Sequence, residues 1–335
     1  MNYSVASNWD DELLNGLNNL NSKSSKDKVV EIFASSAFSF FGSANTGIPD
    51  IQKKEIETKI KKAKSLGFKF NYLVNAPVCP EIKTANDLKI ALDYFSWLES
   101  LAIDSVTIAD ENIIEFVYNN FPKLKINVSI VAAIKTVEEV NNLRAKYPSI
   151  QRVILSQFVN RDRKLLLDHI KNSQIRVGAS ESIEIELLAN EICIYECPRM
   201  RNHYLALSSF SQEKDKIDFD WALCRHIRAD NINEFLNSSW IRPEDINLYE
   251  ELGVNILKIA GRKEPTDSLL LRTAAYLQRS YKGNVMDLFL SEFWPNAEPP
   301  IIDNIELTGY IEKLWKANKK KIDSGEKTDI KYIWG

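Results

Sequence analysis

Short apolar runs rich in β-branched and aromatic residues alternate along this chain with longer segments of helical periodicity. The alternation begins near residue 28 and continues to about residue 278. Strands that alternate with helices in this way form a parallel sheet covered by those helices. The strands are predicted, in chain order, at residues 29–34, 69–75, 105–109, 125–130, 152–156, 183–189 and 256–260.

The number of strand–helix units decides between an open sheet and a closed one. Seven or eight units favour closure, so we predict a TIM-barrel-like α/β fold with parallel strands, with an incomplete or distorted barrel as the alternative. A chain of 335 residues can bury a large core, and α/β barrels commonly use this length for one domain. We assign residues 28–285 to the barrel, residues 1–27 to a polar N-terminal lead-in, and residues 286–335 to a helical and irregular C-terminal extension that packs on the barrel.

Composition narrows the classes of function. The net charge is −3, whereas a protein that binds the nucleic acid backbone usually has a basic excess, so nucleic acid is not the expected partner. No run of about 18 apolar residues is present that could span a membrane. The N-terminal segment has acidic residues and no apolar core, which is unlike a secretory signal. We therefore expect a cytoplasmic protein whose thiols are reduced.

The cysteines are few and are not spread evenly. Residues 190–204, NEICIYECPRMRNHY, contain two of the four cysteines and one of the three histidines. Cys193 and Cys197 follow the predicted strand at 183–189, and Cys79 follows the strand at 69–75. Because the carboxyl ends of barrel strands converge on the functional face, these loops can deliver their thiols to one place.

The spacing of the cysteine pair suggests a metal. The run Cys-Ile-Tyr-Glu-Cys-Pro at residues 193–198 resembles the closing half of a ferredoxin-like cluster motif. Structural zinc sites more often use two-residue gaps. Four cysteines with none left over suit a 4Fe–4S cluster, while a zinc site and simple core packing remain alternatives.

The same segment resembles the collagenase-like peptidase family U32. The resemblance is to a branch with the pattern N-E-x-C-x3-C-P-x-R-x2-H-Y, and it extends to Trp240–Asp245 and to Asn255–Arg262, which are similar to the family's I-R-P-E-D and K-I-x-G-R segments. The run Phe70–Asn75, followed by Cys79, also resembles this branch. The similarity spans roughly residues 28–285.

The resemblance implies an iron–sulfur protein on a barrel-like α/β fold. Members of this kind include oxygen-independent hydroxylation proteins for ubiquinone precursors and enzymes that hydroxylate RNA bases, some of which take the hydroxyl group from prephenate. The RNA-modifying members cluster more cysteines together and often carry an extra C-terminal domain, so a small metabolite is the expected substrate here. The implied ligands of the 4Fe–4S cluster are Cys79, Cys193, Cys197 and Cys224.

The resemblance leaves the role of the cluster open. Oxygen-independent hydroxylation or a related redox step is the expected activity, with prephenate as the candidate hydroxyl donor. Pairing occurs in this family, so a cluster-bearing subunit that relays electrons in a heterodimer is an alternative. A metal-dependent peptidase is a third possibility, although the motifs G-x-S-x-G and H-E-x-x-H are both absent.

Polar residues near the cysteines complete the predicted site. His203 can exchange a proton near neutral pH, and Tyr204 can orient a substrate, although both could simply support the cysteine loop. Arg262, at the end of a predicted strand, suits a substrate carboxylate, and these three form the predicted catalytic set. The predicted substrate-binding residues are Arg199, Arg201, Lys258 and Asn75.

Three further residues receive weaker assignments. His169 lies in a polar helical segment and is expected at the surface. His226 is a candidate donor to the sulfur of Cys224. Arg242 is expected to form a salt bridge at the start of a helix.

Overall fold

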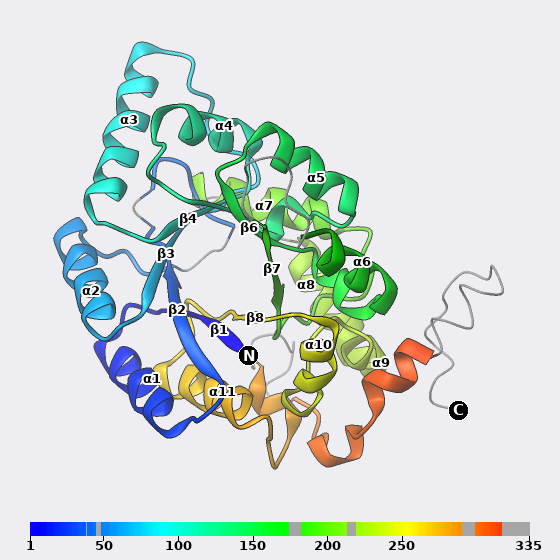
Figure 1. The fold of residues 1–335 in the computed structure, drawn as a ribbon. Coiled ribbons are helices and arrows are strands. Elements are labelled where there is room, and N and C mark those ends of the chain that lie inside the picture. The colour runs from blue at the N-terminus through cyan, green and yellow to red at the C-terminus, as the bar shows by residue number, and fades with distance from the viewer. Residues whose placement is uncertain (38, 45–47, 174–181, 213–218, 290–298, 317–335) are drawn as a thin grey trace.

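The computed structural model describes residues 1–37, 39–44, 48–173, 182–212, 219–289 and 299–316. Eight parallel strands form a closed barrel in which each strand pairs with its neighbours in chain order and β8 returns to β1 (Figure 1). The predicted TIM-barrel-like α/β fold is therefore confirmed. The strands are β1 Asn2–Ala6, β2 Lys28–Ala34, β3 Lys69–Val74, β4 Ser105–Ile108, β5 Ile126–Val128, β6 Ile150–Ile154, β7 Glu184–Leu188 and β8 Ile256–Ile259.

Helices surround the barrel and bury their apolar faces against it (Figure 1). Thr84 and Thr136 form capping boxes that fix where α3 and α5 begin. The α-helices are α1 Asp11–Lys23, α2 Lys53–Ser65, α3 Ala85–Ser100, α4 Glu111–Asn120, α5 Val137–Lys146, α6 Arg163–Ser173, α7 Met200–Gln212, α8 Phe219–Asp230, α9 Ile232–Leu236, α10 Ile246–Leu252 and α11 Thr266–Gln278. The short 3₁₀ helices are η1 Ile130–Ala132, η2 Gln157–Arg161, η3 Pro243–Asp245, η4 Val285–Leu288 and η6 Asn304–Leu307.

Residues 1–27 are not the polar lead-in that the sequence suggested. They supply β1, which pairs with both β2 and β8 and completes the barrel, and then the helix α1. The strand is short, and its central inward side chain is polar: the Ser4 hydroxyl donates to Glu31 Oε1 at 2.7 Å. A polar barrel interior therefore removes the apolar alternation by which a strand is recognised.

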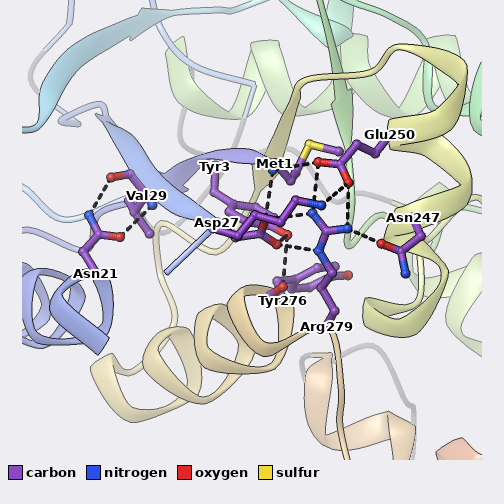
Figure 2. A network of polar contacts seen from close by, with 10 residues as sticks. Met1, Tyr3, Asn21, Asp27, Val29, Asn247, Glu250, Tyr276 and Arg279 are labelled. Atoms are coloured by element: carbon purple, nitrogen blue, oxygen red, sulfur yellow. Dashed lines mark hydrogen bonds and ion pairs between the residues drawn. The ribbon is translucent and has the colours of Figure 1, made fainter. Parts of the chain in front are cut away.

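A partly buried ion network lies at the amino-terminal ends of β1 and β2, since Met1 and Asp27 directly precede these strands (Figure 2). The Met1 ammonium lies 2.9 Å from Asp27 Oδ1 and 3.1 Å from Glu250 Oε1. The Arg279 guanidinium donates to both carboxylates. The network thus joins the chain before β1 to α10 and to the residue that ends α11.

The chain after residue 285 covers part of the barrel. The Tyr310 hydroxyl donates to Asn237 Oδ1 at 2.9 Å, and the rings of Trp315 and Tyr249 lie 5.3 Å apart. The end of the predicted extension, at residues 317–335, lies outside the described residues. In the part of the chain that is described, no helix combines the length and apolar character needed to cross a membrane.

Candidate functional site

A cavity of about 500 Å³ lies at the carboxyl ends of the barrel strands. Its floor comes from strand residues, among them Phe33 of β2, Leu188 of β7 and Lys258 of β8. Residues of α7 and α8, including His203 and Cys224, line another part of it. The barrel therefore places its cavity where this fold places active sites.

Three of the four cysteines line this cavity: Cys193 and Cys197 from the loop after β7, and Cys224 from α8. Burial raises the pKa of the Cys193 thiol well above its ordinary value, and the Glu191 carboxylate adds to this. Burial also raises the pKa of Cys224. These thiols are therefore neutral in the free protein, and a bound metal would have to displace their protons.

The cysteine loop is attached to the neighbouring strand end. Asn190 Nδ2 donates to the carbonyl of Ala260 at 2.9 Å, and the Ala260 amide donates to Asn190 Oδ1 at 2.8 Å. Within the loop, the Cys193 amide donates to Glu191 Oε1 at 2.9 Å. Because one planar side-chain amide makes both hydrogen bonds, it fixes where the loop leaves the barrel, and so where the thiols of the loop lie.

Arg228 is a cavity residue that the sequence analysis missed. It is 2% exposed, and its Nη1 lies 3.5 Å from Cys224 Sγ and 3.3 Å from the carbonyl of Ile192. The guanidinium acts to lower the pKa of Cys224, although burial outweighs it. The four-residue spacing from Cys224 to Arg228 is the signal that predicts this contact, since residues four apart on a helix share a face. His226, the predicted donor to the Cys224 sulfur, is exposed, and it is Arg228 that contacts this sulfur.

Cys79 is not brought to this cavity. Its thiol is buried and lies 3.7 Å from the carbonyl of Ala76, and its backbone amide donates to Asp110 Oδ2 at 2.8 Å. It lines a separate hollow with Asp110 and Lys83. Burial raises its pKa, with Asp110 as a second cause.

The cysteine arrangement bears on which kind of metal group this cavity could hold. Among the described residues, no three or more histidine, cysteine, aspartate or glutamate side chains are grouped as one metal ion would require. An iron–sulfur cluster makes a different demand, because each thiolate binds its own iron atom. Cys193, Cys197 and Cys224 are half-buried and line this cavity, and the Arg228 guanidinium beside Cys224 would offset part of the charge of bound thiolates.

The predicted residues of α7 divide into two groups. His203 and Tyr204 line the cavity, and so does Arg199, just before the helix. The Tyr204 hydroxyl is buried and accepts a hydrogen bond from Gln157 Nε2 at 3.4 Å. Arg201 is exposed and does not line the cavity, since it points from another face of the helix.

Two buried cations occupy the floor of the cavity. Lys258 Nζ lies 3.8 Å from the centre of the Phe33 ring, and burial lowers its pKa. Arg262 donates to the hydroxyls of Ser35 and Ser43, and burial lowers its pKa to about 10. Both side chains are less than one-tenth exposed, so they attract an anion strongly.

One carboxylate on the cavity wall, Glu264, is already paired. Glu264 is bound by both terminal nitrogens of Arg272, at 2.9 and 2.6 Å, and is 3% exposed. Asn75 also lines the cavity, and its Oδ1 accepts weak hydrogen bonds from Ser43 and Ala44. Glu264 is thus occupied by Arg272, whereas the charge of Lys258 is balanced by Glu186 and Glu31 within the barrel.

His169 and Arg242 lie outside the cavity. His169 is buried rather than at the surface, because α6 turns it toward the Lys135 carbonyl, 2.9 Å from its Nε2. Arg242 forms the expected salt bridge, with Glu244 Oε2 2.9 Å from its Nε.

The chain is similar to known proteins in sequence and in fold. A family model described as peptidase family U32 matches residues 43–284. A protein of Methanocaldococcus jannaschii named "Uncharacterized protease MJ1657" is 25% identical over 315 residues, covering 92% of this chain and 88% of the relative. A solved structure, "The Structure of the U32 Peptidase Mk0906", aligns with a TM-score of 0.54 at 16% identity, covering 79% of this chain and 94% of the other.

Proposed function

This chain belongs to peptidase family U32, and we propose that within this family it is an iron–sulfur protein whose cluster is bound by Cys193, Cys197 and Cys224. One observation carries the proposal: three of the four cysteines, from two separate segments, line a single cavity at the barrel mouth. Cysteines that only fill space have no reason to converge in this way. Cys79, the fourth predicted ligand, lines another hollow and is left out of the proposed set.

The proposed activity is an oxygen-independent hydroxylation, or a related redox step, on a small metabolite. A 4Fe–4S cluster would supply electron transfer and, at an iron without a cysteine ligand, a Lewis acid. Prephenate is the proposed hydroxyl donor, by analogy with the family. Arg228, beside Cys224, would balance part of the negative charge of the bound thiolates.

The remaining cavity residues have roles in binding and proton transfer. Arg262 and Lys258 would hold a carboxylate of the metabolite, because they are buried cations on the cavity floor. His203 would move a proton, and Tyr204 would orient the substrate beside it.

A matched set of cysteine variants tests the proposal. The protein and the variants Cys193→Ala, Cys197→Ala, Cys224→Ala and Cys79→Ala would be purified without oxygen and compared by visible and electron paramagnetic resonance spectra. We expect the three cavity variants to lose most of the cluster signal and Cys79→Ala to keep it. Loss in Cys79→Ala equal to that in the other three, with each variant folded, would contradict the proposed ligand set.

Peptidase activity is the second candidate, since the family and both relatives carry that name. His203 and Cys193 line the same cavity, but the raised pKa of Cys193 disfavours a nucleophilic thiolate. A defined peptide assay, with and without a chelator, distinguishes the two proposals. Cleavage that survives complete loss of iron would favour the peptidase.

A further inference from the structure

Glu186 is a buried carboxylate that neither the proposed catalytic set nor the cluster uses. It lies on β7, whose alternate residues Glu184, Glu186 and Leu188 face the barrel interior. The side chain is 0% exposed, and neither of its oxygens has a hydrogen-bond partner among the described residues. An isolated ionised carboxylate in such a place is very costly, so its charge must be compensated or removed.

The charged groups around Glu186 come from several strands. Arg152 of β6 has its Nη1 3.7 Å from Glu186, but the same guanidinium is held closer by Glu31 of β2, at 2.8 Å, and by Glu184, at 2.6 Å. Arg152 is therefore shared among three carboxylates. The other cation near Glu186 is Lys258, on the adjacent strand β8.

Lys258 connects this buried carboxylate to the cavity. It lines the cavity floor with Arg262, and the Glu186 carboxylate is the charge that acts most strongly to raise its pKa, against the lowering effect of burial. Glu186 does not itself line the cavity. A ligand anion beside Lys258 would therefore compete with Glu186 for the same positive charge, without touching Glu186.

We propose that Glu186 takes up a proton when an anion binds beside Lys258 and Arg262. With the cavity empty, the ionised carboxylate balances Lys258. When a ligand carboxylate takes that role, Glu186 accepts a proton from solvent and becomes neutral, so the cavity keeps its charge balance. This inference rests on the anion-binding part of the proposed function and not on the cluster.

The electrostatics set the direction of the effect. Burial raises the pKa of Glu186 to about 7, against the opposing effects of Arg152 and Lys258. An added anion raises it further by repulsion, so binding is coupled to proton uptake. Anion affinity should therefore be constant below about pH 7 and fall at higher pH, by up to tenfold per pH unit.

Calorimetry with succinate as the probe tests the proposal. Titrations of the anaerobically purified protein at one pH slightly above neutrality, in buffers of different ionisation enthalpy, give the number of protons taken up per succinate bound. We expect a measurable uptake approaching one proton in the wild type and none in Glu186→Gln, which keeps the side-chain shape and still binds. Lys258→Met should weaken binding at least several-fold and also abolish the uptake.

Each outcome bears on the proposal. Binding by the wild type without proton uptake, or equal uptake by Glu186→Gln, would overturn it. No succinate binding by the wild type would overturn it as well, because the anion site would be absent. Iron content, measured on the same samples, reports separately on the cluster, so failure of the cluster proposal cannot be confused with failure of this one.

Discussion

Asn190 and Ala260 form a two-way hydrogen bond that ties the cysteine loop to the end of β8. The Asn190 side chain donates to the carbonyl of Ala260 and accepts from its amide, so both backbone polar groups of Ala260 have a partner. Arg262 lies two residues beyond Ala260, and Cys193 three beyond Asn190. The contact therefore fixes the proposed cluster ligands relative to the proposed anion site.

Loss of this contact should weaken both fold and site. Asn190→Leu removes both hydrogen bonds, and we expect the free energy of unfolding to fall by about 1–3 kcal/mol, since partly buried backbone groups lose their partners. Iron content should fall as well. Urea denaturation checks the stability, with the exposed Asn119→Leu as the control. Equal stability of both variants would contradict this account of the loop.

Arg228 should tune the proposed cluster. Arg228→Met removes a positive charge 3.5 Å from Cys224 Sγ, and we expect the cluster to become harder to reduce, because reduction adds negative charge. Each tenfold change in the reduction equilibrium corresponds to about 59 mV for one electron. A redox titration followed by electron paramagnetic resonance checks this, and His226→Ala, at an exposed position on the same helix, is the control. An unchanged or raised potential in Arg228→Met would count against the assignment.

Gly261 should tolerate no side chain. Its φ is +143°, and an added Cβ would lie 2.6 Å from Glu264 Oε1, within the ion pair with Arg272. We expect Gly261→Ala to cost more than the about 1–3 kcal/mol of backbone strain alone. Gly67→Ala is the matched control, since its φ is +87° but nothing lies within 4 Å of an added Cβ. Thermal unfolding that ranks the two equally would contradict the predicted clash.

The free energy of unfolding should fall at low pH because of the ion network shown in Figure 2. Burial acts to raise the pKa of Asp27, but hydrogen bonds from Arg279 and the Met1 amino group outweigh it and hold the pKa below its ordinary value. A carboxyl group with a depressed pKa stabilises the fold above its ordinary range, and this stabilisation is lost as pH falls through the folded-state value.

Asp27→Asn removes one of the two carboxylates that balance the Met1 ammonium and the Arg279 guanidinium, and leaves Glu250 as the other. We expect it to destabilise the protein by about 3–5 kcal/mol at neutral pH and to flatten the fall of stability between about pH 5 and pH 2. Urea unfolding across that range checks both effects. A variant that loses stability with acid as steeply as the wild type would show that Asp27 is not responsible.

Most strands of the barrel could be predicted from the sequence, but the first strand could not. Seven strands show continuous β-rich apolar runs, whereas Asn2–Ala6 places a serine toward a polar interior and is followed by an Asn-rich helix. Hydrophobic periodicity cannot detect a strand whose inward residues bind Glu31 rather than a hydrophobic core. The same polar interior hid Glu186, whose importance depends on neighbours from other strands.

The site was predicted in part for a similar reason. A loop motif can place Cys193 and Cys197 together, and chain order puts strand ends on one face. Neither the motif nor the chain order decides which loop reaches the cavity, so the position of Cys79 in a separate hollow is visible only in the structure. The inward direction of Lys258 likewise depends on the register of β8 with β1 and β7.

The most direct test of the central claim is a count of iron and acid-labile sulfide in protein purified without oxygen from a host that assembles clusters. The account predicts about four of each per chain, as a complete cubane cluster requires. A protein that is folded, with all four thiols free to react and with neither iron nor sulfide, would contradict it. The three convergent cysteines would then be packing residues of a U32 barrel with a different chemistry.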